Sequence, residues 1–192
     1  MSKNRMEAFS DGVLAIIITI MVLEMKVPHG TDFASLYPLL PVFLSYLLSF
    51  VFLGIYWNNH HHLLQAVKYV RGGILWANIH LLFWLSLIPF VTGWMGENNF
   101  APIPVALYGT ILLLAAIAYY ILVRTLIYHH GKDSTLAVAV GNDFKGKISV
   151  VIYVLAILFC FVHPLIAGGL YVSVAIIWLI PDRRIEKIIS DK

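Results

Sequence analysis

Long apolar stretches dominate the 192-residue chain and restrict what it can fold into. A helix needs about 20 mostly apolar residues to cross the hydrocarbon core of a bilayer. Turn-forming residues at 27–32, 96–104, 129–134 and 163–164 mark four of the breaks between such stretches. The six segments lie at about 5–26, 36–64, 72–95, 102–128, 147–163 and 165–180. The sequence therefore predicts an all-α membrane protein, with residues 1–192 forming a single domain of six transmembrane helices.

The composition agrees with a chain that is embedded in a lipid bilayer. Sixty per cent of its residues are hydrophobic and 12% are charged, whereas soluble domains are roughly half apolar and a quarter charged. The basic residues are spread along the chain, so nucleic acid is not an expected partner. Asp11 interrupts the start of the first apolar run and no small-residue cleavage site follows it, so a cleaved signal peptide is not expected. The single cysteine, Cys160, allows no intrachain disulfide.

The positions of lysine and arginine predict the orientation of the chain. If the N-terminus lies inside, Lys26 is the only one of the 13 basic residues that falls on the outer side. The others are Lys3, Arg5, Lys68, Arg71, Arg124, Lys132, Lys145, Lys147, Arg183, Arg184, Lys187 and Lys192. Because cytoplasmic loops carry an excess of basic residues, we expect a multi-pass protein of the cell membrane with both termini in the cytoplasm.

Strongly polar residues occur at a similar inner depth in the first three segments. Ser10 and Asp11 lie one to two turns into the first, His60 lies near the inner end of the second, and Asn78 lies nearly two turns into the third. Trp57 adds an indole donor one turn before His60. Neighbouring membrane helices are often joined by such groups, so we expect a structural cluster. The alternative is that Ser10 and Asp11 cap a helix that begins later.

The histidines do not have the spacing of a metal site. Consecutive residues of a helix point about 100° apart, so the run at 60–62 cannot converge on one ion. His61, His62, His129 and His130 are expected at the membrane interface, and His80 and His163 have no assigned role. We therefore expect no metal and no cofactor. An enzyme would need an ordered nucleophile and base, and no such spacing is present, so the chain is not expected to be one.

One face of the first segment carries a stripe of residues at helical spacing. The stripe consists of Gly12, Ile16, Thr19, Ile20 and Leu23. Asp11 lies roughly 140° around the helix from Ile16, away from the stripe. Isoleucine and leucine also suit a face that contacts lipid, so the stripe alone does not decide its environment. If copies met around an axis, Thr19 would form a ring of hydroxyls between apolar rings, which can gate by dewetting.

Two other channel signatures are not expected to operate. The segment VTGWMG at 91–96 faintly resembles the potassium-channel filter TVGYG, but it closes a full-length span rather than a re-entrant loop. No segment carries arginine at every third position, so steep voltage gating is not expected. The stripe also lacks acidic and basic residues, so fixed charge within the span cannot select ions.

The stretch RMEAFSDGVLAI, which begins at Arg5, resembles the R-x-x-x-F-S-D signature of the transmembrane protein 175 family. This family comprises the lysosomal-type potassium channels and their prokaryotic relatives. Trp57 and His60 are similar to the W-x-x-H of its second span, and Asn78 followed by Pro89-Phe90 is similar to its third. The length resembles the single-repeat prokaryotic form.

The resemblance implies a homotetramer in which the first span lines a central pore that conducts potassium, and in some members protons. It implies a hydrophobic constriction at Ile16, Ile20 and Leu23, with Thr19 contributing to selectivity and no TVGYG filter. It also implies one structural network, formed by Arg5, Phe9, Ser10, Asp11, Trp57, His60 and Asn78.

A potassium-permeable channel is thus the leading interpretation, with potassium as the permeant ion. The alternative is a proton-conducting channel or a proton-coupled transporter that uses Asp11 and His60, because intramembrane Asp and His are common in proton relays.

Overall fold

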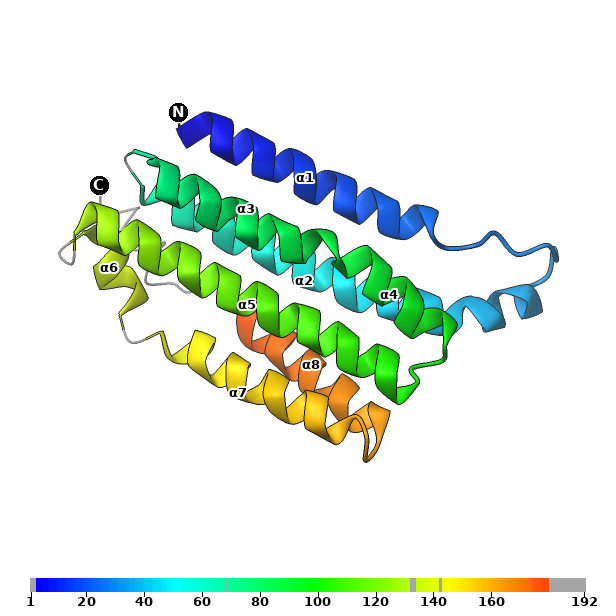
Figure 1. Cartoon of the computed structure of the whole chain (residues 1–192). Coiled ribbons are helices and arrows are strands. Elements are labelled where there is room, and N and C mark those ends of the chain that lie inside the picture. Colours follow the sequence, from blue (N-terminus) through cyan, green and yellow to red (C-terminus); the bar gives the residue numbers. More distant parts are fainter. Residues whose placement is uncertain (1–2, 68, 132–133, 142, 180–192) are drawn as a thin grey trace.

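The computed structural model describes residues 3–67, 69–131, 134–141 and 143–179, all of whose regular elements are helical (Figure 1). They are α1 (Lys3–Leu23), the 3-10 helix η1 (Phe33–Leu39), α2 (Leu40–Gln65), α3 (Gly72–Ser86), α4 (Ile88–Glu97), α5 (Pro102–His130), α6 (Thr135–Val140), α7 (Phe144–Phe159) and α8 (Pro164–Leu179). The last residue of the sixth expected span and six of the basic residues lie outside the described residues: Lys68, Lys132, Arg183, Arg184, Lys187 and Lys192.

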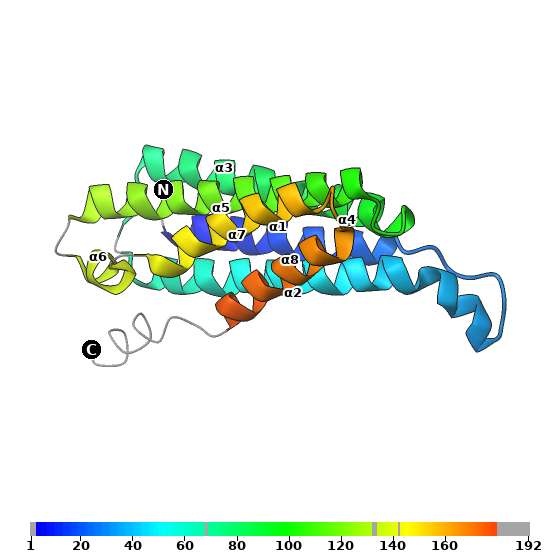
Figure 2. The same ribbon diagram turned by 90° about the horizontal axis from the view of Figure 1, so that it is seen from below.

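The long helices form an elongated bundle. α3 and α5 pack together at its centre, α1 contacts α2, α3 and α4 on one side, and α7 contacts α5 and α8 on the other. The start of α1, the end of α2, the start of α3 and the end of α5 lie at the same end of the bundle (Figure 1). η1 projects from the opposite end (Figure 2).

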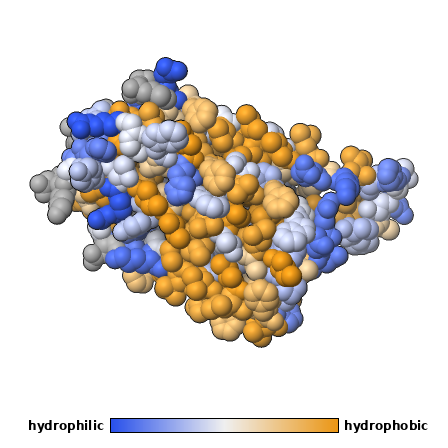
Figure 3. Space-filling model, viewed as in Figure 1, coloured by the Kyte–Doolittle hydropathy of each residue, from blue (hydrophilic) through white to orange (hydrophobic). Residues whose placement is uncertain are grey.

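Four apolar segments among the described residues are long enough to cross a membrane: Lys3–Leu23, Phe33–Gln65, Gly72–Glu97 and Pro102–His130. Apolar side chains form a broad band over the middle of the face in Figure 3, and hydrophilic residues lie towards both ends. α7 and α8 have 16 residues each, so each spans about 24 Å, less than the roughly 30 Å of a hydrocarbon core. An all-α membrane protein is confirmed, whereas the count of six spans stays a prediction.

The third expected span, 72–95, is divided into two helices. α3 ends at Ser86 and α4 begins at Ile88, and the N–H of Leu87 donates to the carbonyl of Trp84 at 3.2 Å. Pro89 is the physical reason, because it has no N–H to donate to the carbonyl four residues before it. The two helices remain nearly in line (Figure 1).

Two further local features differ from the expectations. The first turns of the expected second span, which was placed at 36–64, belong to η1, and α2 begins only at Leu40. Pro41, in the first turn of α2, suits a helix start because its nitrogen has no hydrogen to leave unpaired there. α1 begins at Lys3, so the idea that Ser10 and Asp11 cap a later helix start is wrong.

Candidate functional site

One face of α1 packs against the rest of the bundle. Its buried residues recur at spacings of four, four, three and four, which places them on one side of a helix. They are Met6, Ser10, Leu14, Ile17 and Met21. This face contacts α2, α3 and α4, so α1 is attached along most of its length and its rotation about its own axis is fixed.

The stripe predicted from the sequence lies on the uncovered face of α1. Ile16 is 59% exposed, Ile20 is 40% exposed and Leu23 is 79% exposed in the single chain. Gly12 and Thr19, the other members of the stripe, are also exposed. α1 therefore presents an apolar face to whatever surrounds the chain, either lipid or another subunit.

The hydroxyl of Thr19 bonds to its own helix in the single chain. Its Oγ1 donates to the carbonyl of Ile16 at 2.9 Å. A threonine in a membrane helix commonly makes this bond, and the hydroxyl oxygen keeps lone pairs that can accept a further hydrogen bond. Thr19 thus adds an uncharged hydroxyl to the stripe, and this hydroxyl bonds to its own helix rather than to a buried side chain.

Three of the predicted polar residues form a buried chain of hydrogen bonds across three helices. Asn78 of α3 donates from Nδ2 to Oγ of Ser10 at 2.9 Å, and Ser10 donates to the carbonyl of Met6 at 2.8 Å. The amide oxygen of Asn78 lies 2.7 Å from Nε2 of His60, on α2. Because an amide oxygen only accepts, His60 donates from Nε2. All three side chains are at most 2% exposed.

Asp11 is held on the side of α1 that faces α2. The indole Nε1 of Trp57 donates to Oδ1 of Asp11 at 3.0 Å. Trp57 is 47% exposed, so this bond lies at the edge of the bundle rather than in its core. The carboxylate is thereby directed away from Ile16 and the rest of the stripe.

A second contact between α1 and α2 lies one turn closer to the start of α1. Oε1 of Glu7 is 3.1 Å from Nδ1 of His61, whose ring stacks on that of Trp57. Glu7 and Asp11 are four residues apart on α1, as are Trp57 and His61 on α2. The sequence analysis missed this pairing, although the matching spacings on two antiparallel helices were a signal for it.

Arg5 and Phe9 are not joined to the network within the described part of the chain. Both side chains are exposed, and Arg5 forms no ion pair with any described residue. The single chain therefore brings five of the seven residues of the predicted network into contacts between helices.

The sequence analysis also missed a polar cluster in the core of the bundle. Ser49 of α2 lies 2.6 Å from the hydroxyl of Thr92 on α4, and it donates to the hydroxyl of Tyr108 on α5 at 3.1 Å. All three side chains are buried. Serine and threonine are common within membrane helices, so only the spatial arrangement distinguishes these residues.

The segment that follows α1 is joined to the end of α4 at the surface. Nζ of Lys26 lies 2.9 Å from Oε1 of Glu97, and this hydrogen bond together with the carboxylate charge raises the pKa of Lys26 above its ordinary value. Because both side chains are well exposed to solvent, the pair contributes little to stability.

Apolar segments long enough to cross a bilayer, and a first helix fixed by buried hydrogen bonds, define a multi-pass α-helical membrane protein. Residues 5–89 match the family described as Endosomal/lysosomal potassium channel TMEM175. A protein from Chryseobacterium sp. (strain P1-3) that is named a potassium channel is 59% identical over 191 residues, which cover 100% of both chains. The chain therefore belongs to the TMEM175 family, which is a family of channels and not of enzymes. The resemblance inferred from the first segment is confirmed.

Two more distant relatives agree with this assignment. The crystal structure of a lysosomal potassium-selective channel TMEM175 homolog from Chamaesiphon minutus aligns with a TM-score of 0.80 at 29% identity, covering 94% of this chain and 97% of that one. The mouse protein named endosomal/lysosomal proton channel TMEM175 is 30% identical over 161 residues, which are 74% of this chain and 32% of that one.

Proposed function

We propose that this chain assembles as a homotetramer in the cell membrane and conducts potassium through a central pore lined by α1, without a bound cofactor. The observation that carries the proposal is the division of α1 into two faces. One face is anchored through Ser10 to Asn78 and His60, and the other exposes Ile16 in the single chain. The names of the bacterial relatives support potassium as the permeant ion.

In this proposal the exposed residues of α1 form successive rings around the pore axis. Ile16, Ile20 and Leu23 form the hydrophobic constriction, because water leaves narrow apolar rings easily and ions cannot pass without it. Thr19 supplies a ring of hydroxyls that favours potassium. α4 supports the absence of a TVGYG-type filter, since residues 91–96 are helical there. The carbonyls of Trp94, Met95 and Gly96 accept hydrogen bonds from the backbone N–H groups of Asn98, Phe100 and Asn99.

We further propose that each subunit is one domain of six spans, with both termini in the cytoplasm. Lys3, Arg5, Arg71 and Arg124 are near the helix ends that meet at one end of the bundle, whereas Lys26 follows α1 at the other. This asymmetry supports a cytoplasmic position for the first end. The short α7 and α8 would cross with local thinning of the bilayer.

The seven polar and aromatic residues of the network serve structure rather than conduction in this proposal. Five of them join α1 to α2 and α3 within one subunit. Arg5 and Phe9, which are exposed, are assigned to contacts with neighbouring subunits.

The substitution Ile16→Asn tests the constriction. A ring of amides holds water where isoleucine does not, so we expect potassium flux into liposomes to rise several-fold. Val22→Asn is the matched control, because Val22 is an exposed apolar residue of α1 that lies roughly 120° around the helix from Ile16. Equal flux in wild type and Ile16→Asn, with intact assemblies, would place the gate elsewhere.

A second candidate function is proton conduction or proton-coupled transport through Asp11 and His60. The name of the mouse relative favours it. A proton relay through these residues predicts that Asp11→Asn abolishes the acidification of liposomes under a pH gradient. A proton-coupled transporter also predicts that the transport rate saturates as the substrate concentration rises. Unchanged proton flux in an intact Asp11→Asn assembly would exclude this relay.

A further inference from the structure

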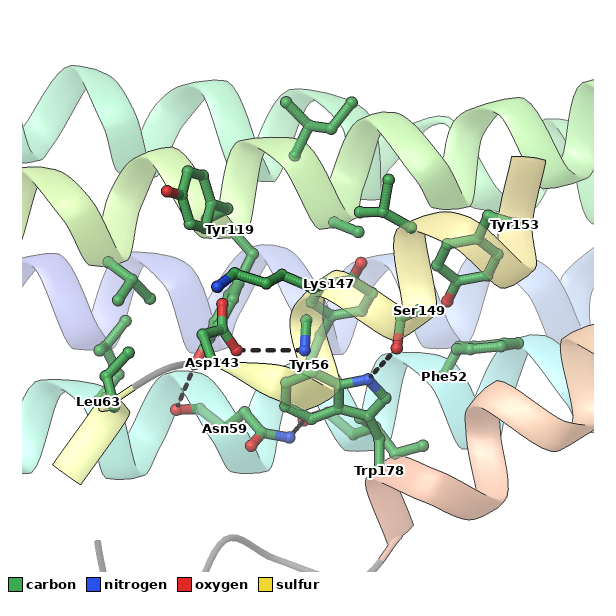
Figure 4. A pocket seen from close by; sticks show the side chains of 18 residues that line it. Phe52, Tyr56, Asn59, Leu63, Tyr119, Asp143, Lys147, Ser149, Tyr153 and Trp178 are labelled. Carbon is green, nitrogen blue, oxygen red and sulfur yellow. Dashed lines mark hydrogen bonds between the residues drawn. The ribbon is translucent and has the colours of Figure 1, made fainter. Parts of the chain in front are cut away.

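A cavity of about 350 Å³ lies between α2, α5 and α7 (Figure 4), and none of its lining residues belongs to α1. Ligand sites between the helices of bundles have volumes of about 300–1,000 Å³ and are lined mainly by apolar and aromatic groups. The volume is at the lower end of that range, so the cavity accommodates one chain of a lipid rather than two. The proposed pore uses none of its lining residues.

The deep part of the cavity is aromatic and carries tyrosine hydroxyls. Phe52, Tyr56, Tyr119 and Tyr153 line it, and the Phe52 and Tyr153 rings lie 6.4 Å apart. The hydroxyl of Tyr119 donates to the carbonyl of Asn59 at 3.2 Å. Tyr153 is only 2% exposed, yet within the described chain no hydrogen bond from its hydroxyl is found. This hydroxyl is not among the fully buried polar atoms that lack a partner, so it opens onto the cavity, where a ligand with an acceptor would pair with it.

The shallow part of the cavity is polar and lies at the start of α7. Asp143 caps this helix by accepting a hydrogen bond from the N–H of Gly146 at 3.1 Å. Lys147, in the first turn, is exposed, lines the cavity and forms no ion pair within the described residues. Basic residues at the cytoplasmic end of pockets between membrane helices bind lipid head groups.

The two parts are connected along α7. Lys147, Val150 and Tyr153 follow at spacings of three, so each lies beside the next on the helix surface, and all three line the cavity. Lys147 and Tyr153 are separated by about 9 Å along the axis. A charged group at the membrane surface and a hydroxyl beneath it match the order of phosphate and ester carbonyl in a glycerophospholipid.

We propose that this cavity binds one ester-linked acyl chain of a glycerophospholipid, with the phosphate at Lys147 and the ester carbonyl accepting from Tyr153. The chain of the lipid lies against Phe52 and Tyr56. The shared chemistry fits either a single-chain lysophospholipid or one chain of a diacyl phospholipid from the inner leaflet.

The test titrates palmitoyl-lysophosphatidylethanolamine into the whole protein in a maltoside detergent, with bound lipid counted by native mass spectrometry. We expect saturable binding of one lipid per chain. Ala116→Phe fills the cavity and abolishes this binding. Ile121→Phe, which introduces the same side chain at an exposed position of α5 outside the lining, leaves it unchanged. Lys147→Gln weakens binding of the lysophospholipid about fivefold but leaves binding of monopalmitoylglycerol, which lacks the phosphate, unchanged.

The outcomes distinguish a phospholipid of the bilayer from a free lysophospholipid, and they include results that overturn the proposal. Diacyl phospholipid that stays bound after extraction and is lost in Ala116→Phe identifies the bilayer as the source, whereas binding of the lysophospholipid alone identifies the free amphiphile. A correctly sized Ala116→Phe protein that binds the lysophospholipid like wild type overturns the proposal. If that variant aggregates, Val150→Phe provides the same test from α7. Palmitate that binds as tightly as the lysophospholipid overturns the assignment of phosphate and ester.

Discussion

Single side chains hold α1 in place through hydrogen bonds that water cannot replace, because the hydrocarbon core of a bilayer contains no water to pair with the exposed groups. Asn78 uses both ends of its amide, donating to Ser10 and accepting from His60. Without Asn78 the buried Nε2–H of His60 would have no acceptor, whereas Ser10 would keep its bond to the carbonyl of Met6. An unsatisfied buried group costs more than the net value of a typical bond. The position of the exposed stripe therefore depends on residues on the opposite face of the same helix.

Asn78→Ala is expected to destabilise the protein by about 1–2 kcal/mol, because Ser10 and His60 each lose a partner. The measurement is unfolding in mixed micelles of increasing sodium dodecyl sulfate content. Asn98→Ala is the control, since the amide of Asn98, just after the end of α4, is exposed and donates to the carbonyl of Trp94 one turn earlier. Equal losses in the two variants would mean that the buried chain of hydrogen bonds does not stabilise the bundle.

Asp11→Ala is expected to impair assembly more than ion preference. The indole of Trp57 loses its acceptor, so the contact between α1 and α2 loosens at the edge of the bundle. Size-exclusion chromatography in detergent measures the effect as a smaller share of assembled protein. An intact assembly whose potassium-to-sodium preference has changed would instead assign Asp11 a role in permeation.

At the scale of elements, α2 and α4 approach each other closely. This contact positions α4, the second half of the third expected span. A Cβ on Gly96 would lie 2.5 Å from Oγ of Ser45 and 2.7 Å from Cα of Val42. The backbone of Val42 cannot move away from an added methyl group as the end of a flexible side chain could. Small residues at such crossings are typical of membrane helices, where packing rather than the hydrophobic effect holds helices together.

Gly96→Ala is expected to destabilise the protein by about 1–3 kcal/mol, because the added methyl group overpacks the crossing of α2 and α4. Gly93→Ala makes the same change on the same helix at a position where no atom lies within 4 Å of the new Cβ. Thermal unfolding in detergent compares the two. A Gly96→Ala protein as stable as Gly93→Ala would show that the helices can separate without cost.

The hydropathy of the sequence predicted the positions of the long helices more reliably than the points at which an apolar run is interrupted. α1 and α5 end within three residues of the expected limits, because long apolar runs specify them. The break before Pro89 was missed because proline is tolerated in membrane helices when neighbouring groups compensate. η1 was missed because its composition, FASLYPL, continues the apolar run of α2.

The depth of the polar residues in the membrane could be predicted from the sequence, but not all of their hydrogen-bond partners could. Counting residues from the helix ends placed Ser10, His60 and Asn78 at one level, where the structure joins them. The contact of Glu7 with His61 and the cluster around Ser49 depend on how each helix is rotated about its axis. That rotation results from packing of whole helices, which no local pattern in the sequence determines.

The whole molecule is a bundle with α1 on its outside (Figure 1). One flank of α1 is packed while the stripe remains uncovered, so a single chain encloses no pathway along it. Conduction along α1 therefore requires several copies, and the predicted count of four follows from the family resemblance. The cavity beside α7 lies on the other side of the bundle, so a lipid there would not obstruct a pore along α1.

The most direct test of the central claim is a cryo-electron microscopy map of the assembly in potassium-containing solution, with density followed along its symmetry axis. The account predicts four copies of α1 around the axis, with Ile16 forming the narrowest ring and Thr19 directed towards the same lumen. A map in which Ile16 contacts acyl chains, or in which another helix surrounds the axis, would contradict it.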